Sequence, residues 1–164
     1  SRTVSRYSGH KNTPHNKKDK NSPAIIKKGN VIYMSHPMSN IYFEYGSLYH
    51  KRYVLMALDL LDSKTTFKVD GLGAQGRATM IKQKNKNRYC LNMTYASPVR
   101  RGCAEIIEDI PDIYNVKIKL CVNEKIKKAY LGVTGEELEI AQENELQTVI
   151  VPKFNCHASV VFEY

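Results

Sequence analysis

The chain has 164 residues, of which 42% are hydrophobic and 25% are charged, and its formal net charge is +9. This length predicts one domain, or one small domain with an attached segment, and the apolar fraction is sufficient for a packed core. The sequence contains no apolar run of the roughly 18 residues that a membrane span needs, so we expect no membrane partner.

The positive charge lies almost entirely in the first 30 residues. Eight bases and one acid give this segment +7, whereas residues 31–164 hold seventeen bases and fifteen acids, a balance of +2. Nucleic-acid-binding domains usually carry their basic charge on a folded face with interleaved aromatic side chains. We therefore expect no nucleic-acid partner, and we interpret residues 15–20 as a solvated basic loop rather than an anion-binding patch.

The first 35 residues predict an irregular segment followed by a short hairpin. Residues 1–23 are polar and punctuated by glycine and proline, which predicts irregular structure. Residues 24–27 are an apolar run, Gly29-Asn30 is a two-residue turn signal, and residues 31–35 read as a second strand.

A long helix is predicted from about Ile41 to Leu61, with Asn40 as its N-cap. Steps of three and four residues separate the members of an apolar stripe along it: Tyr42, Tyr45, Tyr49, Tyr53, Met56 and Leu60. We interpret the stripe as a packing face that lies on the sheet of residues 24–35, on the second half of the chain, or on a second copy. Self-association through the Tyr42–Leu60 helix is one of these outcomes, and a sugar-stacking surface is the alternative.

The second half of the chain reads as strands. Residues 66–70 start it, and Gly71–Gly76 formally fits a dinucleotide loop, but a strand rather than a helix follows, so we interpret a glycine-rich turn. Strands with apolar residues at every second position or with short apolar runs follow, separated by turn signals: residues 77–84, 87–96, 115–122, 129–132, 138–140, 148–152 and 157–164. This pattern predicts an antiparallel β-sandwich.

The fold class that we predict is mainly β: an antiparallel sandwich preceded by a strand-helix remnant of an α/β domain. A single strand-helix unit cannot bury both of its faces, so its partners should lie elsewhere. We place the domain boundaries at 1–62 for the remnant with its basic leader and at 63–164 for the sandwich.

Residues able to carry chemistry are scattered. Four cysteines lack Cys-x-x-Cys spacing, which argues against structural zinc, and whether two of them form a disulfide stays open. Glu108, Asp109 and Asp112 form an acidic connection without the spacing of a calcium loop. His36 follows a strand, the place where α/β sheets line sites, but we prefer loop packing. We therefore predict no catalytic residue, no metal and no cofactor.

Four tyrosines are the candidates for binding carbohydrate, because sugar-binding modules present exposed aromatic rings on one sandwich face: Tyr89, Tyr95, Tyr114 and Tyr130. Most of them share a strand face with Leu, Val and Ile, which favours burial over an exposed platform. The carbohydrate-binding module is therefore the alternative hypothesis rather than the leading one.

From about residue 24 onward the sequence resembles the C-terminal region of β-galactosidase-like glycoside hydrolases. The segments that carry the resemblance are residues 30–37 with the tyrosine-rich helix, 87–98, 106–116, 127–131, 151–153 and 160–163. The resemblance implies that a catalytic (β/α)8 barrel and an amidotransferase-like middle domain are its partners in the parent enzyme. It also implies that the two catalytic glutamates lie upstream, so this chain is a non-catalytic accessory region and not itself an enzyme.

Overall fold

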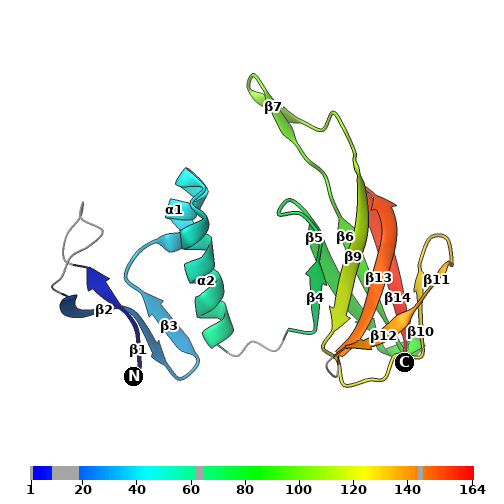
Figure 1. The fold of residues 1–164 in the computed structure, drawn as a ribbon, viewed down its shortest axis with the longest axis horizontal. Helices are drawn as coiled ribbons and strands as arrows, with labels where there is room; N and C mark the ends of the chain where they lie inside the picture. Colours follow the sequence, from blue (N-terminus) through cyan, green and yellow to red (C-terminus); the bar gives the residue numbers. More distant parts are fainter. Residues whose placement is uncertain (1, 9–18, 62–64, 144–145) are drawn as a thin grey trace. The chain divides into compact units, whose positions relative to one another are not determined.

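The computed structural model describes residues 2–8, 19–61, 65–143 and 146–164. The chain divides into two compact units, Ser1–Lys64 and Thr65–Tyr164. Figure 1 shows both helices in the first unit and strands in both. No helix among the described residues is long and apolar enough to cross a membrane.

The first unit contains a three-stranded antiparallel sheet in the order β1-β2-β3. Its strands are Arg2–Ser8, Asp19–Lys28 and Val31–Met34. The predicted hairpin of the last two is confirmed, with Gly29 at φ 56° in the turn and Ile25 fully buried opposite Met34. The prediction of irregular structure for residues 1–23 is wrong at 2–8 and 19–23, because the β1–β2 pairing is made by backbone groups and does not require an apolar alternation.

The predicted long helix is two helices, α1 (Met38–Tyr45) and α2 (Leu48–Leu60). Gly46 separates them in a left-handed conformation (φ 64°), and its N–H donates to the Tyr42 carbonyl, an arrangement that ends a helix. α1 starts after Pro37, three residues before the predicted cap. Asn40 therefore lies inside the helix.

The tyrosine stripe is not the covered face of these helices. Tyr45 and Tyr49 are 77% and 75% exposed, and Tyr53 is 41% exposed. The covered side of α2 instead carries half-buried His50 and Val54 and buried Ala57. The prediction that the stripe packs on the sheet of residues 24–35 is therefore wrong, because the break at Gly46 changes the phase of the helical repeat.

The second unit is a sandwich of two antiparallel sheets. The five-stranded sheet has the order β11-β10-β14-β6-β5, with Glu137–Leu138, Lys128–Leu131, His157–Glu163, Arg88–Thr94 and Arg77–Gln83. The four-stranded sheet has the order β12-β13-β9-β4, with Ile140–Glu143, Leu146–Asn155, Asp112–Leu120 and Phe67–Asp70. The predicted mainly β class with an antiparallel sandwich is confirmed.

The connections follow the predicted turn chemistry. Residues 71–76 join β4 to β5 as a glycine-containing turn, with Gly71 at φ 88°. A short 3-10 turn, η1 (Lys84–Lys86), closes the β5–β6 hairpin. A strand follows the glycines, so the dinucleotide alternative is excluded for this loop.

One apolar core lies between the two sheets. The five-stranded sheet contributes Leu91, Met93, Val160 and Phe162, and the four-stranded sheet contributes Val116, Ile118, Leu120, Val149 and Val151. These side chains are at most 1% exposed. Burying a side chain of this kind contributes about 1.5–3 kcal/mol, so the core is the main source of the unit's stability.

Asn115 interrupts the alternation of β9. Its φ of 52° lies in the left-handed region, and the core face changes parity there. Val116 is buried on one side of it, whereas Ile113 rather than Tyr114 packs against the core on the other side, opposite buried Phe154. Tyr114 is consequently 58% exposed.

A hairpin arm projects from the sandwich, as Figure 1 shows at β7. It is built from β7 (Val99–Arg101) and β8 (Ala104–Ile106), joined through Gly102 at φ 61°. All residues from 98 to 111 are exposed. The sequence predicted only an acidic connection here, which missed the strand at 104–106.

We predict that residues 65–164 fold without the first 64. The core lies entirely within this unit. The polypeptide that lacks the first 64 residues should therefore unfold in one cooperative thermal transition, as measured by near-UV circular dichroism and calorimetry. Leu91→Ala in the same product should lower its free energy of unfolding by about 2–5 kcal/mol, because the site cannot collapse around the lost atoms. A product without a cooperative transition would contradict the prediction.

Candidate functional site

The four candidate tyrosines lie at different places in the sandwich. Tyr89 is 6% exposed and belongs to the core. Tyr130 is half-buried, and its hydroxyl donates to Glu163 Oε1 at 3.0 Å. Tyr114 is exposed, with Lys153 Nζ 5.7 Å from its ring centroid. Among the described residues no two of these rings stack on each other, so the four do not form one platform.

The expectation of burial is confirmed for Tyr89 and wrong for Tyr114. Strict alternation along β9 would put Tyr114 on the same face as Val116 and Ile118, but the left-handed Asn115 turns it outward. In the sequence, this kink is signalled only by the residue type at position 115, because Asn adopts positive φ more readily than most residues.

Tyr95 lines a groove at one end of the five-stranded sheet. The groove holds about 380 Å³, and its other lining residues are Gln75, Arg77, Thr94, Ala96, Pro98, Ile107 and Cys156. The Tyr95 ring packs against Gly73, where a Cβ would approach the ring to 2.8 Å. Arg77, Gln75 and Tyr95 thus line a partly apolar hollow, with no ion pair to Arg77 among the described residues.

A second groove of about 400 Å³ crosses the outer face of β13 beside β11 and β12. Glu136, Glu137 and Glu139 line it together with Thr148, Ile150 and Pro152. Thr148 is 1% exposed, and its hydroxyl has no hydrogen-bond partner within the described residues. Lys128 forms an ion pair with Glu137. This groove is acidic and lacks an aromatic side chain.

Metal-binding chemistry finds no support in the described part of the chain. No group of three or more His, Cys, Asp or Glu side chains is placed to hold an ion there. Glu108 instead binds Arg101 through two hydrogen bonds, and Asp112 pairs with Lys153 at 2.8 Å. The four thiols are free. His36 follows a strand of an antiparallel sheet, so the argument from the ends of parallel strands does not apply to it.

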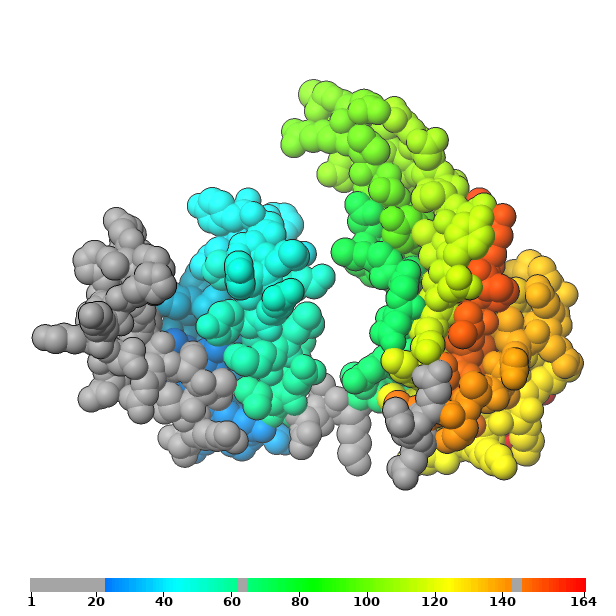
Figure 2. All heavy atoms as spheres, in the orientation of Figure 1, coloured from blue at the N-terminus to red at the C-terminus, as the bar shows by residue number. Residues whose placement is uncertain are grey.

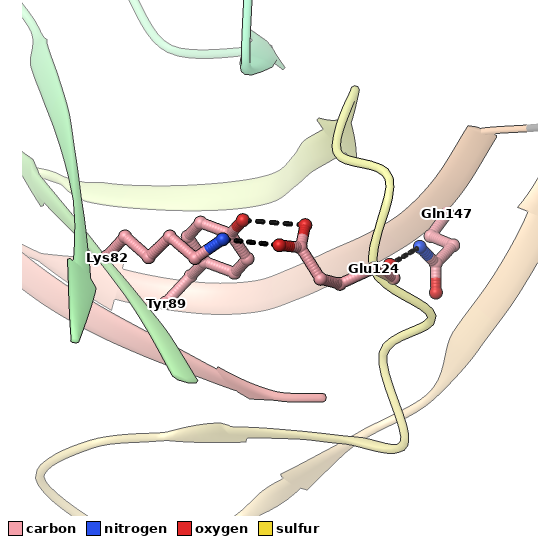
Figure 3. A network of polar contacts seen from close by, with 4 residues as sticks. All are labelled: Lys82, Tyr89, Glu124 and Gln147. Atoms are coloured by element: carbon pink, nitrogen blue, oxygen red, sulfur yellow. Dashed lines mark hydrogen bonds and ion pairs between the residues drawn. The ribbon is translucent and has the colours of Figure 1, made fainter. Parts of the chain in front are cut away.

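The most connected polar group joins both sheets at one end of the sandwich (Figure 3). Glu124, in the loop after β9, binds Lys82 of β5 through Oε1 and accepts a hydrogen bond from the Tyr89 hydroxyl at 2.8 Å. The Glu124 carbonyl accepts from Gln147 Nε2 at 2.9 Å, and Gln147 Oε1 accepts from the Ile126 N–H at 2.6 Å. The loop is thereby tied to β5, β6 and β13.

Aromatic rings complete this network. Lys82 Nζ lies 5.2 Å from the centroids of both Tyr89 and Tyr164, which are themselves 5.2 Å apart. A cation over two aromatic faces and beside a carboxylate is well held. Sequence reasoning selected Tyr89 but missed Lys82, Glu124 and Gln147, since their separation along the chain leaves no local pattern.

The network shifts the pKa values of its members in the directions expected for a structural ion pair. The hydrogen bond from Lys82, followed by that from Tyr89, lowers the pKa of Glu124 to about 2. The hydrogen bond with Glu124 is the main cause that raises the pKa of Lys82. Burial raises the pKa of Tyr89. A carboxylate held ionised in this way is suited to fixing a loop and not to donating a proton at neutral pH.

The comparisons with known proteins relate the chain to a solved structure. No protein-family model and no curated protein matches the chain. Among solved structures the chain is similar to α-L-fucosidase isoenzyme 2 from Paenibacillus thiaminolyticus, with a TM-score of 0.81 and 33% sequence identity. The match covers 99% of this chain and 25% of the fucosidase chain. The chain is therefore related to a part of a larger glycoside hydrolase.

This match confirms the predicted relation to glycoside hydrolases at that general level. The sequence resemblance pointed to β-galactosidase-like enzymes, whereas the matched protein is named as a fucosidase.

The Glu124 network predicts a pH dependence of stability. Because folding lowers the pKa of Glu124 from 4.5 to about 2, its stabilisation should be complete above pH 4.5 and be lost as the pH falls toward 2. Glu124→Gln should lower the melting temperature at pH 7 and flatten its decline between pH 4.5 and 2. Exposed Glu136, whose side chain makes no ion pair within the described residues, gives the matched control Glu136→Gln. Equal acid sensitivity of the wild type and Glu124→Gln would contradict the assignment.

Proposed function

We propose that this chain is a non-catalytic accessory region of a larger glycoside hydrolase, where it packs against the rest of the enzyme. The observation that carries the proposal is the similarity of 99% of the chain to one quarter of a fucosidase. An enzyme of that size has room for its catalytic machinery in the other three quarters. The chain's own carboxylates then need no catalytic role.

The chemistry of those carboxylates supports the proposal. Glycoside hydrolysis uses two carboxyl groups across a cleft, one of which must stay protonated to act as the acid. Here the ion-paired acids have the opposite character: bonds to Lys119, Lys153 and Lys82 lower the pKa values of Asp70, Asp112 and Glu124. Carboxylates that are ionised and paired with lysine serve poorly as general acids.

The first unit supplies the contact surface that such a role requires. Its helices expose Phe43 (90%), Tyr45, Leu48 and Tyr49, each more than 60% open. Soluble proteins seldom leave apolar patches of this kind uncovered. We propose that the catalytic barrel and the middle domain of the parent enzyme cover them, with self-association of this chain as the competing arrangement.

We also propose a type of sugar for the parent enzyme. The fucosidase match supports an α-L-fucosidase-like parent. The β-galactosidase-like assignment, with an amidotransferase-like middle domain represented here by residues 1–62, rests on the sequence resemblance. Activity of the parent enzyme toward aryl fucosides and aryl galactosides distinguishes the two.

A carbohydrate-binding role for the sandwich is the second candidate, and the groove at Tyr95 favours it. Sugar sites combine an aromatic or apolar surface with a few hydrogen-bonding groups, as Tyr95, Gln75 and Arg77 do. Tyr89, Tyr114 and Tyr130 lie elsewhere and do not add to this groove. Only Tyr95 of the four predicted positions therefore supports the module.

We predict that the 164-residue chain hydrolyses neither aryl galactosides nor aryl fucosides, because lysine partners hold Asp70, Asp112 and Glu124 in the ionised form that a general acid cannot use. The measurement is release of the aryl alcohol by the repurified chain, with the parent enzyme as positive control. Turnover above background that survives repurification would contradict the accessory role.

A titration of the same chain with fucose and galactose, followed by amide NMR, tests the binding role. Shifts confined to Tyr95 and Arg77 that disappear in Tyr95→Ala would favour the module. A spectrum that does not change would leave the packing role as the better account.

A further inference from the structure

The hairpin arm, residues 98–111, is the largest feature of the sandwich that the core does not explain. Its strands β7 and β8 pair only with each other, as a separate two-stranded sheet. Figure 2 shows it extending as a continuous projection beyond the body of the second unit. An isolated two-stranded hairpin is only marginally stable in water, so such an arm needs a surface to rest on.

One face of the hairpin carries an apolar pair at its root. Val99 lies opposite Ile106 in the β7–β8 register, and Arg101 and Ala104 follow on the same face, whereas Arg100 and Glu105 lie opposite each other on the other face. Val99 and Ile106 are each 39% exposed, and Ile107 and Ile110 beyond them are 53% and 47% exposed. Four β-branched apolar side chains are therefore partly exposed along the projection, and one of them, Ile107, also lines the groove at Tyr95.

The arm is preorganised by contacts between its own side chains. Arg101 binds Glu108 through two parallel hydrogen bonds, Nε to Oε1 at 3.0 Å and Nη2 to Oε2 at 2.6 Å. This pair holds the returning segment against the hairpin. Pro98 and Pro111 stand at the two roots, where they cannot extend a backbone ladder. A preformed element pays less conformational entropy on docking than a flexible loop.

Charge argues against a second copy of the arm as its partner. β7 carries Arg100 and Arg101, and the returning segment carries Glu105, Glu108 and Asp109. A twofold pairing of two arms along β7 would place arginine beside arginine, and a pairing along β8 would place glutamate beside glutamate. Like charges directly opposite destabilise a sheet, so this closed arrangement is disfavoured.

We propose that the arm docks, through Val99, Ile106, Ile107 and Ile110, into an apolar groove on the part of the same polypeptide that lies outside this sequence. This inference rests on the proposed function, because the matched fucosidase has three quarters of its chain beyond the aligned region. The arm is then a strap that joins the sandwich to the enzyme body.

Hydrogen–deuterium exchange tests the proposal. The amides of residues 98–111 are compared in the natural polypeptide, at concentrations where it is monomeric, and in the 164-residue chain. Docking should slow their exchange by about tenfold or more in the natural polypeptide. Equal exchange in both, or slowing that appears only when the polypeptide self-associates, would overturn the proposal.

Two double variants make the test specific. Val99→Thr with Ile106→Thr keeps residues that favour strands but removes the apolar contact, and should abolish most of the slowing. Ile81→Thr with Ile150→Thr alters two similarly exposed residues outside the arm (57% and 48%). This control pair should leave the slowing of exchange in the arm unchanged. Equal effects of the two pairs would overturn the assignment of the contact to the arm.

Glycosidase activity of the natural polypeptide is read in the same samples. An active enzyme with a rapidly exchanging arm would leave the proposed function standing and refute the docking. An inactive polypeptide whose arm exchanges slowly would leave the docking standing and refute the proposed function.

Discussion

The mutual burial of two alternating strand faces is the constraint on which the sandwich depends. β6 and β14 at the centre of one sheet, and β9 and β13 in the other, each present apolar side chains at every second position, and neither face could stay in water. The side chains that meet are almost fully buried, so each contributes at the upper end of what hydrophobic burial provides. Polar groups close one end of this core. There the Glu124 network fixes a loop to three strands of both sheets.

The features outside that core share one property, which is apolar surface that their own unit leaves exposed. The helices of the first unit expose Phe43, Tyr45 and Tyr49, and the arm exposes Val99, Ile106 and Ile107. Soluble monomeric proteins seldom leave two such surfaces exposed. A region that rests on the body of a larger enzyme can carry both, and the match to one quarter of a fucosidase is in keeping with it.

The strands with strict alternation could be predicted from the sequence, and the deviations from alternation could not. Tyr89, Leu91 and Met93 read correctly as one buried face because period two follows directly from strand geometry. Tyr114 did not, because a single left-handed residue at Asn115 reverses the parity of β9. The packing of the tyrosine stripe on the sheet of residues 24–35 was not borne out, and the end of α1 at Gly46 gave two helices where the periodicity predicted one. Neither backbone conformation leaves a periodic trace. The β1 strand and the Glu124 network depend on partners distant in the sequence, which no local pattern reveals.

We propose that this chain is one part of an active glycoside hydrolase. The most direct measurement is immunoprecipitation from the native source with an antibody against residues 65–164, followed by the mass and glycosidase activity of the captured polypeptide. The account predicts a single polypeptide several times longer than 164 residues that hydrolyses an aryl fucoside or aryl galactoside. Capture of a 164-residue protein, or of a long polypeptide without glycosidase activity, would contradict it.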